Sequence, residues 1–241
     1  MEILITNDDG WGAKGIMTLV RLMESLGHVT VVAPDSVRSG MSNAITFNHL
    51  HMQQIEHTEQ RDVYVSDGTP SDCIKLGLHI VYEGRRKPDL IVSGINHGSN
   101  AAINVIYSGT MGAVFVGAEN GVRSIGFSIN SYDADADFSK FEPYILEITR
   151  GILSMPEPPY GKCWNVNAPV GDILGVRLTR QCRGFWNEEV ETLRDENGDI
   201  YYKLGGAFCN AEPEAEDTDE WAMAHGYISV TPSTIDTTWK D

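Results

Sequence analysis

Two adjacent aspartates near the start of the chain are the residues best suited to carry chemistry. Asn7-Asp8-Asp9-Gly10 follows a short apolar run, and no basic residue lies next to the pair in the sequence. In a tight turn both carboxylates can face one ion, and Mg²⁺ or Mn²⁺ would relieve their mutual repulsion. These residues are also favourable turn formers in their own right. The pair therefore leaves both a metal site and an ordinary turn open.

Two neutral oxygen donors come from other segments of the chain. Ser39 lies in the polar stretch 35–43, and Asn96 ends the apolar run 88–96. Together with Asp8 and Asp9 they would give Mg²⁺ a ligand set that still leaves positions for water and phosphate oxygens. Each could instead be only a hydrogen-bonding group in its own loop. A zinc site is disfavoured, because no HExxH spacing occurs and His49 and His51 lack a third ligand nearby.

The segment Tyr107-Ser108-Gly109-Thr110 precedes a predicted helix over 108–120. Backbone amides, two hydroxyls and a helix N-terminus together can bind an anion such as phosphate. An ordinary serine N-cap is the alternative interpretation. No GxGxxG motif follows the first apolar run and no GxxxxGK[ST] motif occurs, which disfavours dinucleotide cofactors and P-loop chemistry.

The elements that must position these residues alternate between two periodicities. The apolar runs 2–6 and 28–34 flank a segment, 16–26, with helical spacing, which predicts a βαβ unit with parallel strands. Later runs predict strands over 88–96, 124–129 and 163–169, alternating with helices over 69–82, 108–120 and 138–154. This pattern predicts an α/β fold with an open, doubly wound, mostly parallel, Rossmann-like sheet. Because ligands bind at the carboxyl ends of such strands, the loops carrying the polar residues should open on one edge.

The character of the sequence changes near residue 170, which suggests a catalytic core over 1–170 and a β-rich appendage over 171–241. Segments 185–194 and 199–204 flank Asn197-Gly198, a strong hairpin signal. A short helix capped by Thr218 and a strand over 227–232 follow. A hairpin that cannot bury both faces alone predicts an oligomer contact.

Composition limits the class of partner. Acidic residues outnumber basic ones 34 to 18 in the 241-residue chain, for a formal net charge of −16, which argues against binding a nucleic-acid polymer. No apolar run is long enough to span a membrane, and the start of the chain lacks a basic region typical of a signal peptide. We therefore expect a cytoplasmic protein whose 4 cysteines are reduced thiols.

Taken in order along the chain, these motifs resemble those of the SurE family. The resemblance covers nearly the whole chain, from residue 1 to about 236. Its motifs are Asn7 to Gly10, Arg38-Ser39-Gly40, Ser42-Asn43, Gly68 to Cys73, Ser93 to Asn96, Gly98 with Asn100, Tyr107 to Ala113, Thr218-Asp219 and Gly226 to Pro232. Members differ near the end of the chain, where some carry a histidine shortly after the position of Asp236. Here Trp239-Lys240 occupies that place, which leaves open a contribution of the tail to proton transfer.

Membership of that family would imply a divalent-metal-dependent 5′/3′-nucleotidase, in some members also active on short polyphosphate. Such proteins are cytoplasmic and form dimers or tetramers through exchanged C-terminal segments. By resemblance, one Mg²⁺ or Mn²⁺ would be held by Asp8, Asp9, Ser39 and Asn96. The phosphate of a nucleoside monophosphate would then meet Ser108, Gly109 and Thr110, with Asn43 close by.

The expected reaction is hydrolysis of a nucleoside monophosphate to nucleoside and phosphate by in-line attack of a metal-activated water. Asp8, Asp9 and Asn96 are the expected catalytic residues. A non-catalytic module that binds a nucleotide–metal complex would use the same ligands and remains the alternative. A phosphatase with an aspartate nucleophile needs Asp-x-Asp after the first strand, and here the aspartates are adjacent.

Overall fold

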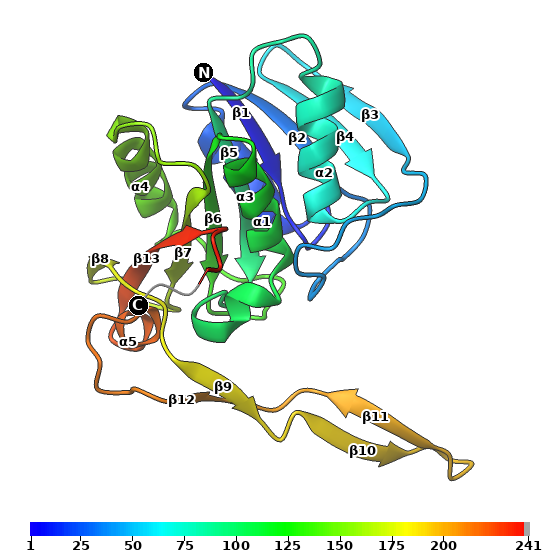
Figure 1. Cartoon of the computed structure of the whole chain (residues 1–241), viewed down its shortest axis with the longest axis vertical. Helices are drawn as coiled ribbons and strands as arrows, with labels where there is room; N and C mark the ends of the chain where they lie inside the picture. Colours follow the sequence, from blue (N-terminus) through cyan, green and yellow to red (C-terminus); the bar gives the residue numbers. More distant parts are fainter. Residues whose placement is uncertain (239–241) are drawn as a thin grey trace.

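A large central sheet organises the molecule, and the computed structural model describes residues 1–238, so Trp239-Lys240 lies outside the described residues. The sheet has nine strands in the order β3-β4-β2-β1-β5-β6-β7-β13-β8 (Figure 1). Their bounds are β1 Glu2–Thr6, β2 His28–Pro34, β3 Met52–His57, β4 Arg61–Ser66, β5 Leu90–His97, β6 Arg123–Ile129, β7 Lys162–Ala168, β8 Gly175–Leu178 and β13 Tyr227–Thr234.

Most neighbouring strands run parallel, as the alternating pattern predicted. The strands from β4 through β2, β1, β5 and β6 to β7 are all paired in parallel. The exceptions lie toward the edges, where β3 is antiparallel to β4 and β13 is antiparallel to β7. The sheet is therefore mixed but mostly parallel, and it includes two strands, β8 and β13, that come from the chain after residue 170.

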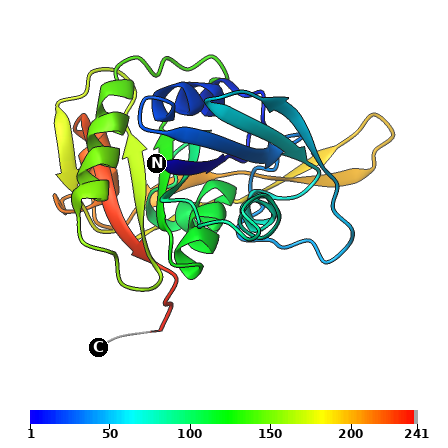
Figure 2. The same ribbon diagram turned by 90° about the horizontal axis from the view of Figure 1, so that it is seen from above.

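Helices cover both faces of the sheet: α1 (Lys14–Met23) and α4 (Glu142–Ser154) lie on one, α2 (Pro70–Leu76) and α3 (Gly109–Glu119) on the other (Figure 2). Alternate residues of β1 show why. Ile3 and Ile5 are buried in the cluster that contains the apolar residues of α1 and α4. Leu4 is buried with residues of α2 and α3. Among the helices of residues 1–238, none combines the length and apolar character needed to cross a bilayer.

Capping fixes where α2 begins. The Thr69 side chain accepts a hydrogen bond from the backbone of Asp72, the Asp72 carboxylate accepts one from the backbone of Thr69, and Pro70 is the first helical residue. The helix predicted over 69–82 is regular only to Leu76. Residues Gly77–Val81 continue it as a wider π-helical segment.

A long arm leaves the core after β8 and returns to it before α5 (Asp219–Ala224) (Figure 1). It consists of two antiparallel pairs, with bounds β9 Gly184–Asn187, β12 Ala207–Asn210, β10 Val190–Arg194 and β11 Ile200–Leu204. The hairpin predicted at Asn197-Gly198 is present at the tip. The strand predicted over 185–194 is divided, and Glu188 at the break has a positive φ of 54°. Such a conformation interrupts a regular strand.

Candidate active site

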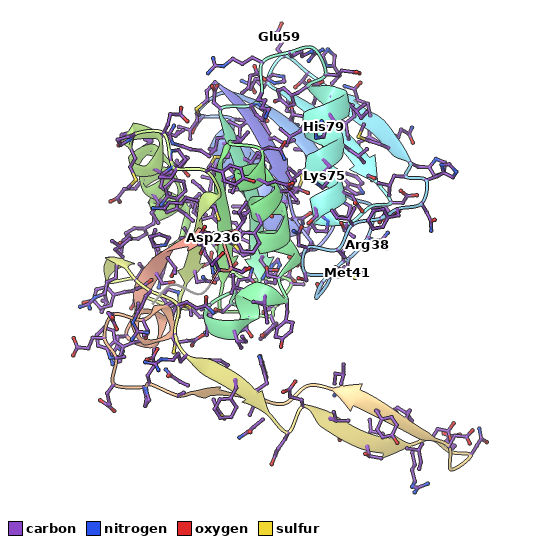
Figure 3. All side chains as sticks on the ribbon, viewed as in Figure 1. Arg38, Met41, Glu59, Lys75, His79 and Asp236 are labelled. Atoms are coloured by element: carbon purple, nitrogen blue, oxygen red, sulfur yellow. The ribbon has the colours of Figure 1, made fainter. Side chains whose placement is uncertain are left out.

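The carboxyl ends of β1, β2 and β5 meet at the centre of one sheet edge. Strand β1 pairs with β2 on one side and with β5 on the other, so the strand order reverses there, where open α/β sheets bind ligands. Arg38 and Met41, in the loop after β2, lie at this end of the sheet, opposite Glu59 (Figure 3). A pocket of about 240 Å³ opens here, lined by Asp8, Ser39, Gly40, Asn96, His97, Gly98, Ser99, Asn100, Asn104, Tyr107, Ser108, Tyr132 and Trp186.

Asp8 is the most constrained carboxylate of the site. It is only 3% exposed, and its Oδ1 accepts a hydrogen bond of 2.6 Å from Oγ1 of Thr110. The pKa of Asp8 is raised to about 6, mainly by burial; the hydrogen bond from Thr110 opposes this rise, and the nearby Asp9 contributes to it. The backbone of Arg38 donates to the Asp8 carbonyl at 2.7 Å, which ties the loop carrying Ser39 to this residue. A cation beside Asp8 would favour its ionised form.

Asp9 has a partner that the sequence did not reveal. The Nδ1 atom of His97 lies 3.0 Å from Oδ2 of Asp9. A carboxylate only accepts hydrogen bonds, so the histidine nitrogen is the donor. The ring of His97 also packs against Phe138, with centroids 5.5 Å apart, so it is held on two sides. The only signal for this role in the sequence was the position of His97 directly after Asn96.

The two predicted neutral ligands both line the pocket. Asn96 is 7% exposed, and its amide nitrogen donates to the carbonyl of Gly98 at 2.7 Å, which leaves its amide oxygen available to a ligand. The pairing of β5 with β6 shifts register between Ser93 and Asn96, and such irregularities re-aim side chains next to functional sites. Ser39, from the loop after β2, is exposed.

The start of α3 lies directly against Asp8. Ser108 is the N-cap, and its hydroxyl oxygen accepts from the backbone of Met111 at 3.0 Å. Gly109 comes so close that a Cβ atom on it would lie 3.0 Å from the Cβ atom of Asp8. Thr110 is fully buried, and its hydroxyl is occupied by Asp8. Of the predicted phosphate-binding side chains, only Ser108 lines the pocket.

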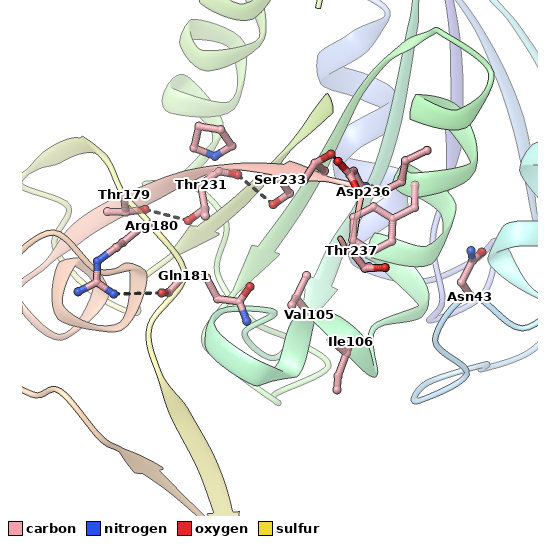
Figure 4. Close-up of a pocket in the computed structure, with 14 residues that line it drawn as sticks. Asn43, Val105, Ile106, Thr179, Arg180, Gln181, Thr231, Ser233, Asp236 and Thr237 are labelled. Atoms are coloured by element: carbon pink, nitrogen blue, oxygen red, sulfur yellow. Dashed lines mark hydrogen bonds between the residues drawn. The ribbon is translucent and has the colours of Figure 1, made fainter. Parts of the chain in front are cut away.

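Asn43 lies apart from this pocket. Its side-chain oxygen accepts a hydrogen bond of 2.7 Å from Ser71, and it lines a larger neighbouring cavity of about 700 Å³. Val105, Ile106 and residues of β13 form other walls of that cavity (Figure 4). Adjacent Ser42 is bonded to the carbonyls of Ile106 and Tyr107, which keeps the loop near the start of α3.

The oxygen donors of the pocket suit a hard divalent cation. Asp8 supplies a carboxylate to the pocket, and Ser39 and Asn96 add neutral oxygens. Asp9 is not among the residues that line the pocket, but its carboxylate lies close enough to raise the pKa of Asp8. Within residues 1–238, no group of three or more His, Cys, Asp or Glu side chains is placed to hold a metal ion. A cation here would therefore depend on the serine and asparagine oxygens as well as the aspartates.

Comparisons with known proteins agree with this fold. The sequence matches the family described as Survival protein SurE over residues 3–188. It is 47% identical to a protein named 5′-nucleotidase SurE from Phocaeicola vulgatus, over 98% of this chain and 91% of that protein. A protein of the same name from Flavobacterium psychrophilum is 46% identical, over 98% and 92%.

Among solved structures, the crystal structure of the Sure protein from Aquifex aeolicus superposes with a TM-score of 0.84. It shares 35% sequence identity, and the match covers 99% of this chain and 95% of that one. The fold and the sequence agree over nearly the whole length, and the motifs around Asp8, Ser39, Asn96 and Ser108 stand in the pocket that this fold builds. The chain is a member of the SurE family.

Proposed function

We propose that this chain is a metal-dependent phosphomonoesterase that hydrolyses nucleoside monophosphates to nucleoside and phosphate, as a 5′-nucleotidase. The observation that carries the proposal is a single pocket lined by Asp8, Ser39, Asn96 and the N-cap of α3. Relatives about half identical to it over nearly their whole length bear the name 5′-nucleotidase SurE. Oxygen ligands beside a helix N-terminus suit a phosphate ester held by a cation.

In this proposal Asp8, Asp9, Ser39 and Asn96 hold one Mg²⁺ or Mn²⁺. When bound, the cation supplies neutralisation of the phosphate charge and activation of the attacking water. Thr110 holds one oxygen of Asp8 in a fixed orientation, and the other oxygen would bind the cation. His97 does the same for Asp9. Both aspartates are thus fixed before substrate arrives, which lowers the cost of reaching the reactive geometry.

The start of α3 receives the phosphate. The Ser108 oxygen accepts from Met111, so its hydroxyl hydrogen remains available to donate to a phosphate oxygen. Gly109 and Thr110 occupy the first turn, whose amides lack partners within the helix and favour an anion. Asn43 would contribute only from the adjoining cavity, through a substrate that reaches it. The proposed reaction is in-line attack of water on the phosphorus atom held there.

Phosphate release from a panel of nucleoside monophosphates tests the proposal. The protein is assayed after EDTA treatment and again after Mg²⁺ or Mn²⁺ is restored. Release should vanish with chelation and return with metal. A protein that binds Mn²⁺ in calorimetry but releases no phosphate from any member of the panel would instead be a nucleotide–metal binding module.

We also propose that the arm assembles this chain into a homodimer or homotetramer. Strands β10 and β11 pair so that one face of the hairpin carries large apolar side chains, namely Val190, Ile200, Tyr202 and Leu204. All of these are exposed, and Leu204 is 79% exposed. An isolated two-stranded hairpin is marginally stable in water, so a partner surface that covers this face would stabilise it.

A further inference from the structure

The pocket beside Asp8 has two chemically different parts. Its polar part consists of Asp8, Ser39, Asn96 and Ser108, the groups assigned to the cation and the phosphate. Its other part includes two aromatic side chains from distant segments: Tyr132, just after β6, and Trp186 in β9 of the arm. Neither ring is needed to hold a metal ion or a phosphate group.

Trp186 is held firmly in place. Its indole Nε1 donates to Oδ1 of Asn104 at 2.9 Å, and Asn104 lines the same pocket. Its ring packs edge-on against Phe208, its partner in β12, with centroids 6.1 Å apart. Because a hydrogen bond and a packed neighbour already fix the ring, a ligand that stacks on it does not have to immobilise the side chain on binding.

Tyr132 lies over the loop that follows Asn96. A Cβ atom on Gly98 would come 2.7 Å from Cε1 of Tyr132, so the glycine is what allows the ring to lie against the backbone here. The residue is 77% exposed. Isolated exposed aromatic residues are common on protein surfaces. Tyr132 differs from them because it borders the pocket that contains Asp8 and Trp186.

We propose that Trp186 and Tyr132 bind the base of the substrate by stacking, while the phosphate occupies the polar part of the pocket. This assignment rests on the proposed function, because a nucleoside monophosphate has the same division into a dianionic end and a flat aromatic end. Every base offers a ring face, so stacking selects for a base without reading its identity. Asn104 orients Trp186 and is a positioning residue.

The test compares two substrates that differ only in the base, AMP and ribose 5-phosphate. In the wild type, KM for AMP should be lower than KM for ribose 5-phosphate. Trp186→Ala and Tyr132→Ala should each raise KM for AMP roughly 5- to 100-fold, the range seen for loss of a base-stacking ring. KM for ribose 5-phosphate should stay unchanged, and Trp186→Phe, which keeps a ring, should lose less than Trp186→Ala.

Tyr160→Ala is the matched control, since Tyr160 is 74% exposed but does not line this pocket. It should leave both KM values unchanged. Equal KM values for the two substrates in the wild type would overturn the proposal. So would alanine variants that change both KM values alike, the result expected if the rings only support the fold.

Equilibrium dialysis with AMP gives a readout that does not require turnover. Trp186→Ala and Tyr132→Ala should weaken AMP binding by the same factor as they raise KM, with circular dichroism spectra like that of the wild type. If the wild type hydrolyses neither substrate, the proposed function fails. The stacking site still stands or falls on whether the two variants lose AMP binding and Tyr160→Ala keeps it.

Discussion

His97, the residue directly after Asn96, holds the Asp9 carboxylate in a fixed orientation. Its Nδ1 atom is 3.0 Å from the carboxylate, and its ring rests on Phe138. Metal-binding carboxylates and histidines are commonly held by such neighbours, and losing one typically costs roughly 10- to 100-fold in metal affinity or activity. In the proposed metal site, His97 would support Asp9 without needing to touch the ion.

Replacing His97 by Ala should weaken Mn²⁺ binding by roughly 10- to 100-fold, the usual cost of losing a residue that orients a metal ligand. His97→Asn, whose amide can still donate from a similar place, should recover part of the affinity. Titration calorimetry with Mn²⁺ measures both. His49→Ala is the control, because His49 is exposed in the loop before β3 and does not line the pocket. Unchanged Mn²⁺ affinity in His97→Ala would contradict this role.

Residue types and their place after apolar runs predicted half of the named site residues into one pocket, whereas Asp9, Asn43, Gly109 and Thr110 are not among the residues that line it. Asp8, Ser39, Asn96 and Ser108 were predicted from polar junctions, and all of them line one pocket. The contact between His97 and Asp9 could not be predicted, because it depends on the exact end of β5. The position of Trp186 depends on pairing between β9 and β12, which no local pattern encodes.

At the scale of elements, the close approach of the first turn of α3 to the turn after β1 determines how Asp8 meets the helix. Gly109→Ala should lower turnover at least tenfold, since the added Cβ would press on Asp8 and on Pro70. The fold should persist, because the contact is tight rather than overlapping. Gly151→Ala, in α4, adds a methyl group where no atom lies within 4 Å, and should leave turnover unchanged. Equal turnover in the two variants would show that the close contact between Gly109 and Asp8 is not critical for the reaction.

The short helix α5 joins the base of the arm to the loop before α3. The Asp219 carboxylate accepts from the backbone amides of Ala102 and Cys182, each at 2.9 Å. Its neighbour Glu220 is partly buried, and burial together with the nearby charge of Asp219 raises the pKa of Glu220 to about 7. Protonated Glu220 is therefore favoured in the folded state over the unfolded one, where its pKa is about 4.5.

That difference gives a pH dependence of defined sign. Between about pH 4.5 and pH 7 the folded protein binds more protons at Glu220 than the unfolded chain, so its contribution to stability falls as pH rises. Glu220→Gln removes this loss, and the variant should gain stability relative to the wild type on going from pH 5 to pH 8. Urea unfolding at both pH values measures it. Glu214→Gln, at an exposed position nearby, should show no such gain.

A mostly parallel sheet with helices on both faces followed from the alternation of apolar runs with helical spacing. The order and direction of the strands at the edges of the sheet could not be predicted from that alternation. Strand β13 enters beside β7 in the antiparallel sense and then accepts β8 on its other side. The sequence over 227–232 predicted a strand, but the residues of one short strand do not specify which other strands it pairs with.

At the scale of the whole molecule, the exposed apolar face of the arm predicts self-association. The double substitution Tyr202→Ser and Leu204→Ser should lower the molar mass in solution relative to the wild type, as measured by light scattering on a sizing column. Lys203→Ser, on the opposite face of the same strand, should leave the mass unchanged. A wild type that elutes as a monomer would refute the proposed role of the arm.

Turnover of AMP by Asp9→Asn, with Mg²⁺ or Mn²⁺ in excess, tests the central claim most directly. The amide keeps the size and hydrogen-bonding reach of the carboxylate but lacks its charge, so the fold should be retained. We expect turnover to fall at least about a hundredfold. Loss of a residue that only supports a metal ligand already costs up to about a hundredfold, and Asp9 is proposed to be a ligand itself. Near-wild-type turnover in a folded Asp9→Asn protein would show that the reaction does not depend on this site.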